Sequence, residues 1–132
     1  MRIIGIDYGS KRIGVAVSDP SGRFALPLSI VPNTPALAVE IEKIAAEQGA
    51  DEVVLGESKT YGGQPNDILE ASLAFKSELE KRGLVVHLEP EFMTSMHAER
   101  LQGKHDKIDA SAAAIILQSY LDKARTEEDL GE

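Results

Sequence analysis

The feature that most constrains this fold is a short apolar segment that ends in an acid. Residues 3–6 read Ile-Ile-Gly-Ile, and Asp7 follows them directly. Because neighbouring residues of a strand point to opposite faces, this segment is apolar on both faces, as expected of a strand in the middle of a sheet. An ionised carboxylate at the end of such a strand carries a desolvation cost unless a positive charge meets it. We therefore expect Asp7 at the edge of the core, with a cationic partner.

A second strand follows after a tight reversal. Gly9, Ser10 and Lys11 supply turn residues, and residues 13–18 then alternate large apolar with small side chains, which is the period of a strand. This pattern predicts an antiparallel hairpin. Its turn would hold Lys11 and Arg12 close to Asp7.

Composition sets the outer bounds of the protein. A chain of 132 residues with 42% hydrophobic content suits one core, so we predict a single domain over residues 1–125 and a disordered acidic tail over residues 126–132. The absence of cysteine excludes disulfides and thiolate metal sites. No apolar run approaches the ~18 residues of a membrane span. We expect a cytoplasmic protein that does not enter a membrane.

The remaining elements alternate between strands and helices. Pro27 marks an edge strand, and Gly49 and Gly83 mark helix ends. The predicted elements are a strand over 23–31, a helix capped by Thr34 with Pro35 first, a strand over 51–56, a helix from Pro65, a strand over 84–88, a short helix capped by Thr94 or Ser95, and a helix over 108–123. This order predicts an α/β fold: a mixed five-stranded sheet, with an antiparallel hairpin and parallel strands, and helices on both faces.

Acidic residues follow several of the predicted strands. Asp7, Glu57 and Glu91 fall at or just beyond three strand ends, and Asp109 opens the last helix. Ligands bind outside the carboxyl ends of parallel strands in such sheets. Carboxylates that converge there repel one another unless divalent cations lie between them, and oxygen ligands suit magnesium or manganese. Two such ions about 4 Å apart can promote phosphodiester cleavage.

Each acid also has a structural interpretation. Asp7 could bond its own turn, Glu57 could simply end a strand, and Glu91 could be an exposed loop acid. Asp106 resembles a helix N-cap or first-turn acid, and Asp109 stays open on spacing alone.

The net charge of −8 at first opposes a nucleic-acid partner, because phosphate binding needs Lys and Arg. Four of the acids, however, lie within residues 127–132, which contain no basic residue. The basic residues instead gather near the predicted turns, as Lys11 with Arg12 and as Arg100, Lys104 and Lys107. The sequence is therefore still compatible with a local group of basic residues around an acidic pocket.

Three segments resemble one known family. Residues 4–19 and 107–122 closely resemble motifs of the YqgF family, the pre-16S ribosomal RNA nucleases also described as Holliday-junction-resolvase-like, and residues 91–100 lie between these two motifs as a third point of resemblance. The resemblance implies an RNase H-like fold and metal-dependent cleavage of structured nucleic acid. It places the family's three acids on Asp7, Glu91 and Asp109, with Mg²⁺ or Mn²⁺ as cofactor. The candidate substrate-binding residues are Lys11, Arg12, Thr94, Arg100 and Lys107.

Two departures from the family pattern matter. The family usually has an Asp before and an Arg after its middle acid, where this chain has Pro90 and Phe92. Glu57 and Ser58 replace a common Leu-Pro. Glu57 resembles in position a second acid of the related Holliday-junction resolvases, which makes it a candidate auxiliary metal ligand.

The sequence supports hypotheses from different classes. The first is a nuclease of the two-metal type that acts on ribosomal RNA precursor or branched DNA, as a monomer or weak homodimer. The second is a non-catalytic nucleic-acid-binding or ribosome-assembly module, which Pro90 and Phe92 favour. A third, an actin-like or sugar-kinase ATPase, fits residues 7–10 locally but needs two domains to enclose a nucleotide.

Overall fold

A computed structural model describes residues 2–9, 11–57, 67–90 and 105–130. The elements follow the predicted order. They are β1 (Arg2–Tyr8), β2 (Arg12–Ser18), β3 (Ala25–Pro32), α1 (Leu37–Gln48), β4 (Ala50–Glu57), α2 (Asp67–Lys81), β5 (Val85–Pro90) and α4 (His105–Leu130). The predicted short helix after Thr94 or Ser95, and the predicted start of a helix at Pro65, lie outside the described residues.

The strands form one mixed sheet in the order β3-β2-β1-β4-β5. β2 pairs antiparallel with both β1 and β3, whereas β4 pairs parallel with both β1 and β5. This confirms the predicted five-stranded arrangement. β1 is central, as its apolar residues indicate, and β3 with Pro27 is an edge strand.

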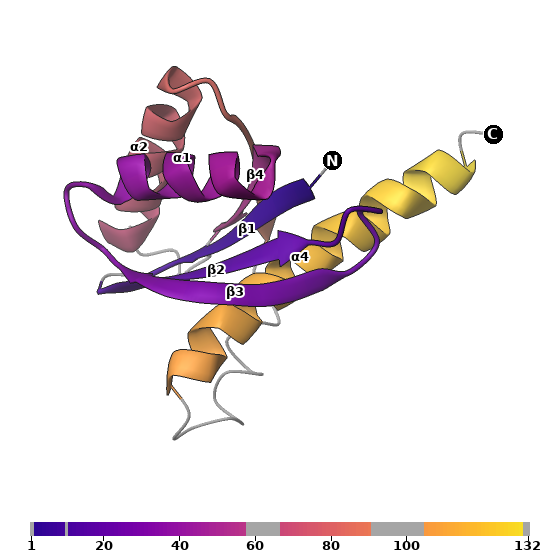
Figure 1. Ribbon diagram of the computed structural model, residues 1–132, viewed down its shortest axis with the longest axis horizontal. Helices are drawn as coiled ribbons and strands as arrows, with labels where there is room; N and C mark the ends of the chain where they lie inside the picture. Colours follow the sequence, from indigo (N-terminus) through magenta and orange to yellow (C-terminus); the bar gives the residue numbers. More distant parts are fainter. Residues whose placement is uncertain (1, 10, 58–66, 91–104, 131–132) are drawn as a thin grey trace.

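Helices cover both faces of the sheet, as predicted (Figure 1). One core cluster joins the sheet to α1 and α2, and the other joins it to α4. The first contains Ile4, Ile6, Ile41, Leu55 and Leu79, and the second contains Ala16, Val54, Ala113, Ile116 and Leu117. The alternation of β1 therefore assigns its even-numbered residues to the α1–α2 face and its odd-numbered residues to the α4 face.

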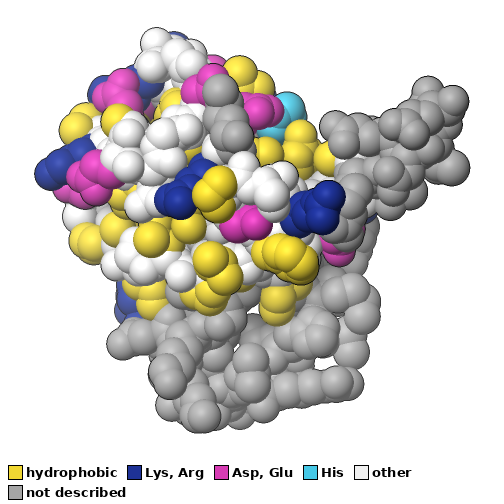
Figure 2. Space-filling model, turned by 45° about the vertical axis from the view of Figure 1, so that its right-hand side comes forward, with side chains coloured by type: hydrophobic (Ala, Val, Ile, Leu, Met, Phe, Trp, Pro, Cys, Tyr) yellow, Lys and Arg dark blue, Asp and Glu magenta, His cyan; other side chains and the backbone are white. Residues whose placement is uncertain are grey.

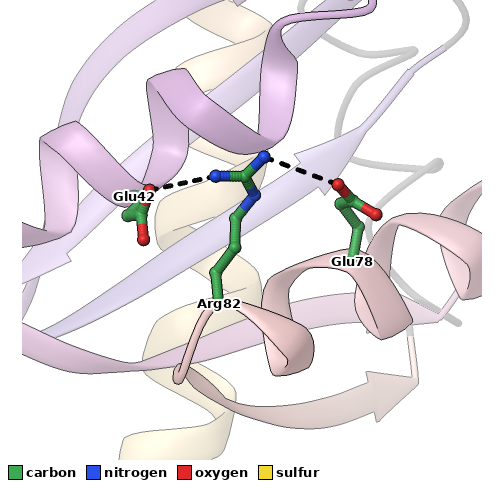
Figure 3. Close-up of polar contacts among 3 residues, drawn as sticks. All are labelled: Glu42, Glu78 and Arg82. Carbon is green, nitrogen blue, oxygen red and sulfur yellow. Dashed lines mark hydrogen bonds and ion pairs between the residues drawn. The ribbon is translucent and has the colours of Figure 1, made fainter.

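α1 and α2 are also joined at their exposed surface. Arg82 follows α2, and its guanidinium lies 3.2 Å from Glu42 of α1 and 3.5 Å from Glu78 of α2 (Figure 3). Because these groups are solvent-exposed, each ion pair contributes at most about 1 kcal/mol. The Arg82–Glu42 pair links the two helices at the surface and adds little to the stability of the fold.

Three helix boundaries differ from the sequence prediction: the start of α1 and both ends of α4. α4 begins at His105 and not at residue 108, so Asp109 lies inside the helix and does not open it. Thr34 does not cap α1, because its Oγ1 accepts a hydrogen bond from the Ala36 N–H in a turn that precedes the helix. The prediction ends the last helix at Lys123 and treats residues 126–132 as disordered, whereas α4 continues to Leu130. Residues 124–128 include Ala, Arg and Glu, which are good helix formers. None of the helices in the described ranges is long and apolar enough to cross a membrane.

Candidate functional site

The carboxyl ends of the parallel strands define the candidate site. Ile6 of β1 pairs with Leu55 of β4, so Asp7 and Gly56 come next on these neighbouring strands. Glu57 closes β4 opposite Pro90, the last residue of β5. Asp7, one residue before the end of β1, and Glu57, the last residue of β4, thus lie at the carboxyl ends of adjacent strands. Glu91, next along the chain after β5, lies outside the described residues.

Asp7 lies on the α4 side of β1. The neighbouring Ile6 and Tyr8 pack in the cluster formed with α1 and α2, and the Tyr8 ring lies 5.5 Å from that of Phe75 in α2. Strand alternation therefore directs the Asp7 carboxylate to the opposite face, where α4 packs. Its side chain is half-buried. An oxygen donor that is part-buried at a strand end fits a hard divalent cation.

α4 crosses β1 at Gly5. A Cβ atom built on Gly5 would lie 2.7 Å from the Leu117 Cβ and 3.0 Å from the Ala113 carbonyl oxygen. Only glycine allows this close approach, so the helix backbone lies directly on the central strand. Leu117 and Ala113 thus place two successive turns of α4 over the residue that lies two positions before Asp7.

The direction of α4 relates Asp109 to this crossing. The Gln118 amide bonds the Arg23 carbonyl and the Ala25 N–H, beside the start of β3. In Figure 1 the yellow carboxyl end of α4 lies on the same side as the N-terminus of β1, and its orange end lies away from it. Asp109 precedes Ala113 by about one helical turn. The backbone position of Asp109 is therefore displaced from Gly5 toward the carboxyl edge of β1.

The β1–β2 turn carries two basic candidates. Lys11 and Arg12 are both exposed, at the same sheet edge as Asp7. Asn33, which follows β3, holds this turn: its Nδ2 donates to the Gly9 carbonyl at 2.9 Å, and its backbone N–H donates to the Lys11 carbonyl at 2.9 Å. Sequence reasoning missed Asn33, although an Asn after an edge strand is a common turn-bonding residue.

Sequence reasoning also missed Glu89. This residue of β5 is only 4% exposed and lies on the α4 face of the sheet. The Ser119 hydroxyl donates to its Oε2 at 2.9 Å, and the Lys123 ammonium lies 2.7 Å from the same oxygen. Both partners come from α4. Glu89 thus fastens the strand that leads to Glu91 onto the helix that carries Asp109, and the alternation of β5 was the available signal.

For the remaining site candidates the structure describes the backbone alone or no atoms. Thr94 and Arg100 lie outside the described residues, and for Glu57, Lys107 and Asp109 only the backbone is described. Among the side chains that are described, no three His, Cys, Asp or Glu groups come together as a metal site. On the side of the molecule that Figure 2 shows, Lys and Arg side chains are scattered among acidic and apolar ones over the described residues.

Comparisons with known proteins show the family and the fold of the chain. A family model described as RuvX, Holliday junction resolvase, matches residues 1–123. A relative from Streptococcus pyogenes named "Putative pre-16S rRNA nuclease" is 35% identical over 93% of this chain and 99% of its own length, and a second from the same species is 34% identical.

Solved resolvases share the fold. RuvC of Thermus thermophilus matches with a TM-score of 0.64 at 17% identity, over 96% of both chains. The same protein in complex with a Holliday junction substrate matches with a TM-score of 0.60 at 18% identity, again over 96% of both chains. A complex of fowlpox virus resolvase with Holliday junction DNA matches with a TM-score of 0.57 at 15% identity, over 94% of this chain and 99% of the resolvase. These similarities confirm the RNase H-like architecture, and with the family model spanning nearly the whole chain, this protein belongs to the RuvX family of Holliday junction resolvases.

Proposed function

We propose that this protein is a metal-dependent endonuclease that acts on structured nucleic acid, with Asp7, Glu91 and Asp109 as its catalytic acids. The observation that carries the proposal is the position of Asp7, half-buried at the carboxyl end of the central strand and facing the helix that contains Asp109. Family membership supports nuclease chemistry. Glu57, which ends the neighbouring strand, is the proposed auxiliary ligand.

The proposed cofactor is Mg²⁺ or Mn²⁺, held as a pair by Asp7, Glu91 and Asp109. When bound, such ions promote attack on a phosphodiester and stabilise the charge on the leaving oxygen. The chain contributes the carboxylate oxygens that hold the ions in position. Carboxylate oxygens are hard donors, which suit these cations.

Lys11 and Arg12 are the proposed phosphate contacts at this edge. Both are exposed: Lys11 lies in the turn after β1, and Arg12 is the first residue of β2. Their charges offset the repulsion between an acidic protein and a polyanionic substrate. Thr94, Arg100 and Lys107 complete the proposed substrate-binding set on the basis of the family resemblance.

The proposed substrate is the 5′ end of pre-16S ribosomal RNA or a branched DNA. The names of the relatives support the first substrate, and the junction complexes of the structural neighbours support the second. We further propose that residues 1–125 act as one domain, as a monomer or weak homodimer, in the cytoplasm.

A second candidate is a non-catalytic nucleic-acid-binding or ribosome-assembly module. Pro90 and Phe92, which flank Glu91, favour it because they replace the Asp and Arg usual in the family. Such a module would bind nucleic acid without cutting it, and its affinity would not depend on the charge of Asp7.

A cleavage assay separates the two candidates. Wild type is incubated with a folded pre-16S RNA fragment and with a four-way DNA junction, with Mg²⁺ or with a chelator. The nuclease proposal predicts Mg²⁺-dependent cleavage of at least one substrate and a loss of several orders of magnitude in Asp7→Asn. Asp51→Asn, the same change at an exposed site on β4, should cleave as wild type does. Binding of either substrate without cleavage would favour the module.

A further inference from the structure

Asn33 forms two hydrogen bonds to the segment that carries Lys11 and leads into Arg12, beside the candidate site. It follows β3, whose last residue Pro32 pairs with Arg12 of β2. Because β3 runs parallel to β1, its carboxyl end lies at the same sheet edge as Asp7. Asn33 is thus adjacent to the site but belongs to a different strand from the acids.

The backbone N–H and the side-chain amide of Asn33 both donate hydrogen bonds to the β1–β2 turn. The backbone N–H continues the β2–β3 pairing to the Lys11 carbonyl, whereas the side-chain amide spans to the Gly9 carbonyl, each at 2.9 Å. The turn between these contacts is tight, since a Cβ on Gly9 would lie 2.5 Å from the Arg12 carbonyl oxygen. The Asn33 amide therefore supplies a lateral contact from a neighbouring strand.

We propose that Asn33 is a positioning residue for phosphate binding, which fixes the turn so that Lys11 and Arg12 present their charges beside Asp7. This inference rests on the proposed function. Lys and Arg side chains lose substantial conformational freedom when they bind a phosphate. Binding also requires the backbone that carries these side chains to be ordered, and the hydrogen bond from the Asn33 side chain fixes that backbone before the substrate arrives. Asn33 therefore strengthens binding although it does not contact the substrate.

The test is a double-mutant cycle on nucleic-acid affinity. Binding of a fluorescent four-way DNA junction and of a fluorescent RNA hairpin is measured in chelator, so that no cleavage occurs, over a series of salt concentrations. The variants are Asn33→Ala, Lys11→Ala with Arg12→Ala, and all three changes together. Asn33→Ser is measured alongside, because serine is uncharged and too short to reach the Gly9 carbonyl. It replaces Asn33→Ala if the alanine variant does not melt cooperatively.

We expect Asn33→Ala to weaken binding about five- to tenfold at low salt, the factor that corresponds to one hydrogen bond of about 1–1.4 kcal/mol. The slope of log affinity against log salt should flatten by about one phosphate contact. In the background that lacks Lys11 and Arg12, the same change should have less than about a twofold effect. This loss of effect separates positioning of these two side chains from a general loss of structure.

Thr34→Ala is the matched control. Thr34 lies in the same loop, and its Oγ1 accepts from the Ala36 N–H before α1. Its removal should lower the melting temperature but leave affinity and salt slope unchanged. Unchanged binding in Asn33→Ala, or an equal loss in both backgrounds, would overturn the inference while the proposed function stands. If wild type binds neither probe, the proposed function fails first and the inference fails with it.

Discussion

Gly5 and Leu117 are in such close contact that no side chain fits between them: a Cβ on Gly5 would lie 2.7 Å from the Leu117 Cβ. This contact sets how deeply α4 lies on β1, and thereby the separation between Asp7 and the turn of α4 that contains Asp109. Stability and site geometry are coupled at one position.

Gly5→Ala should therefore impair both properties. The added methyl meets Leu117 and the backbone of Ala113, so α4 must shift, with an expected loss of about 1–3 kcal/mol in the free energy of unfolding. Gly83→Ala is the control, because Gly83 has a φ of 94° and open space around it. That variant should lose about 1 kcal/mol through backbone strain alone. Chemical denaturation measures both losses. Only Gly5→Ala should also reduce Mg²⁺-dependent cleavage. Equal cleavage by the two variants would show that the packing of α4 on Gly5 does not determine the geometry of the site.

The Glu89 cluster should show measurable coupling. Lys123→Ala leaves a buried carboxylate with Ser119 as its partner on α4, but Lys123 is 60% exposed and its charge is partly screened. We expect a loss of about 1 kcal/mol, compared with about 0.3–0.5 kcal/mol for Lys76→Ala, which removes the surface pair with Glu80. A cycle with Glu89→Gln, followed by urea denaturation, gives the coupling energy. A coupling no larger than that of the surface pair would show that burial of Glu89 adds nothing.

The β2–β3 loop should show a defined acid sensitivity. Asp19 accepts hydrogen bonds from the Ser21 hydroxyl and from the Phe24 and Arg23 N–H groups, which lower its pKa from 3.8 to about 2. A depressed carboxyl pKa contributes stability above the unfolded value, and this contribution is lost as the pH falls through the folded value. The gap in melting temperature between wild type and Asp19→Asn should therefore be full above about pH 4 and shrink toward pH 2. Ser21→Ala should show a smaller gap, and a pH-independent gap would contradict the assignment.

Asp7→Asn should alter the thermal response to metal. Without metal, the variant should melt at the wild-type temperature or slightly above it, because one of several mutually repelling carboxylates has become neutral. With Mg²⁺ present, wild type should gain stability that Asp7→Asn does not gain. Asp51→Asn should retain the full gain. A lower metal-free melting temperature with an intact Mg²⁺ response would instead make Asp7 a structural residue of its turn.

The sequence predicted the arrangement where one local rule was sufficient. An apolar run on both faces of residues 3–6 indicated a central strand, and Pro27 indicated an edge strand; the structure confirms both. The predicted start of α1 was wrong because a Thr can either cap a helix or bond within a turn. The Thr34 hydroxyl accepts a hydrogen bond in the turn before α1 instead of capping the helix. The extent of α4 was missed because charge was weighed above helix propensity in residues 124–129.

The positioning contacts could not be predicted because they join residues distant in sequence. Glu89 meets Ser119 and Lys123 from another element, and Asn33 reaches Gly9 across the hairpin. Alternation along β5 indicates the face of the sheet on which Glu89 lies, but the partners of Glu89 and Asn33 depend on how a separate element packs beside each of them, which alternation and composition do not supply. The roles of Asp7, Glu91 and Asp109 in metal binding stay predictions, since they come from strand ends and a family resemblance.

The most direct test of the central claim is anomalous X-ray scattering from crystals soaked in Mn²⁺. The account predicts anomalous density between the carboxylates of Asp7 and Asp109 in wild type, and its loss in Asp7→Asn crystals of the same form. Density that persists in Asp7→Asn, or manganese bound only away from the carboxyl edge of β1 and β4, would contradict it.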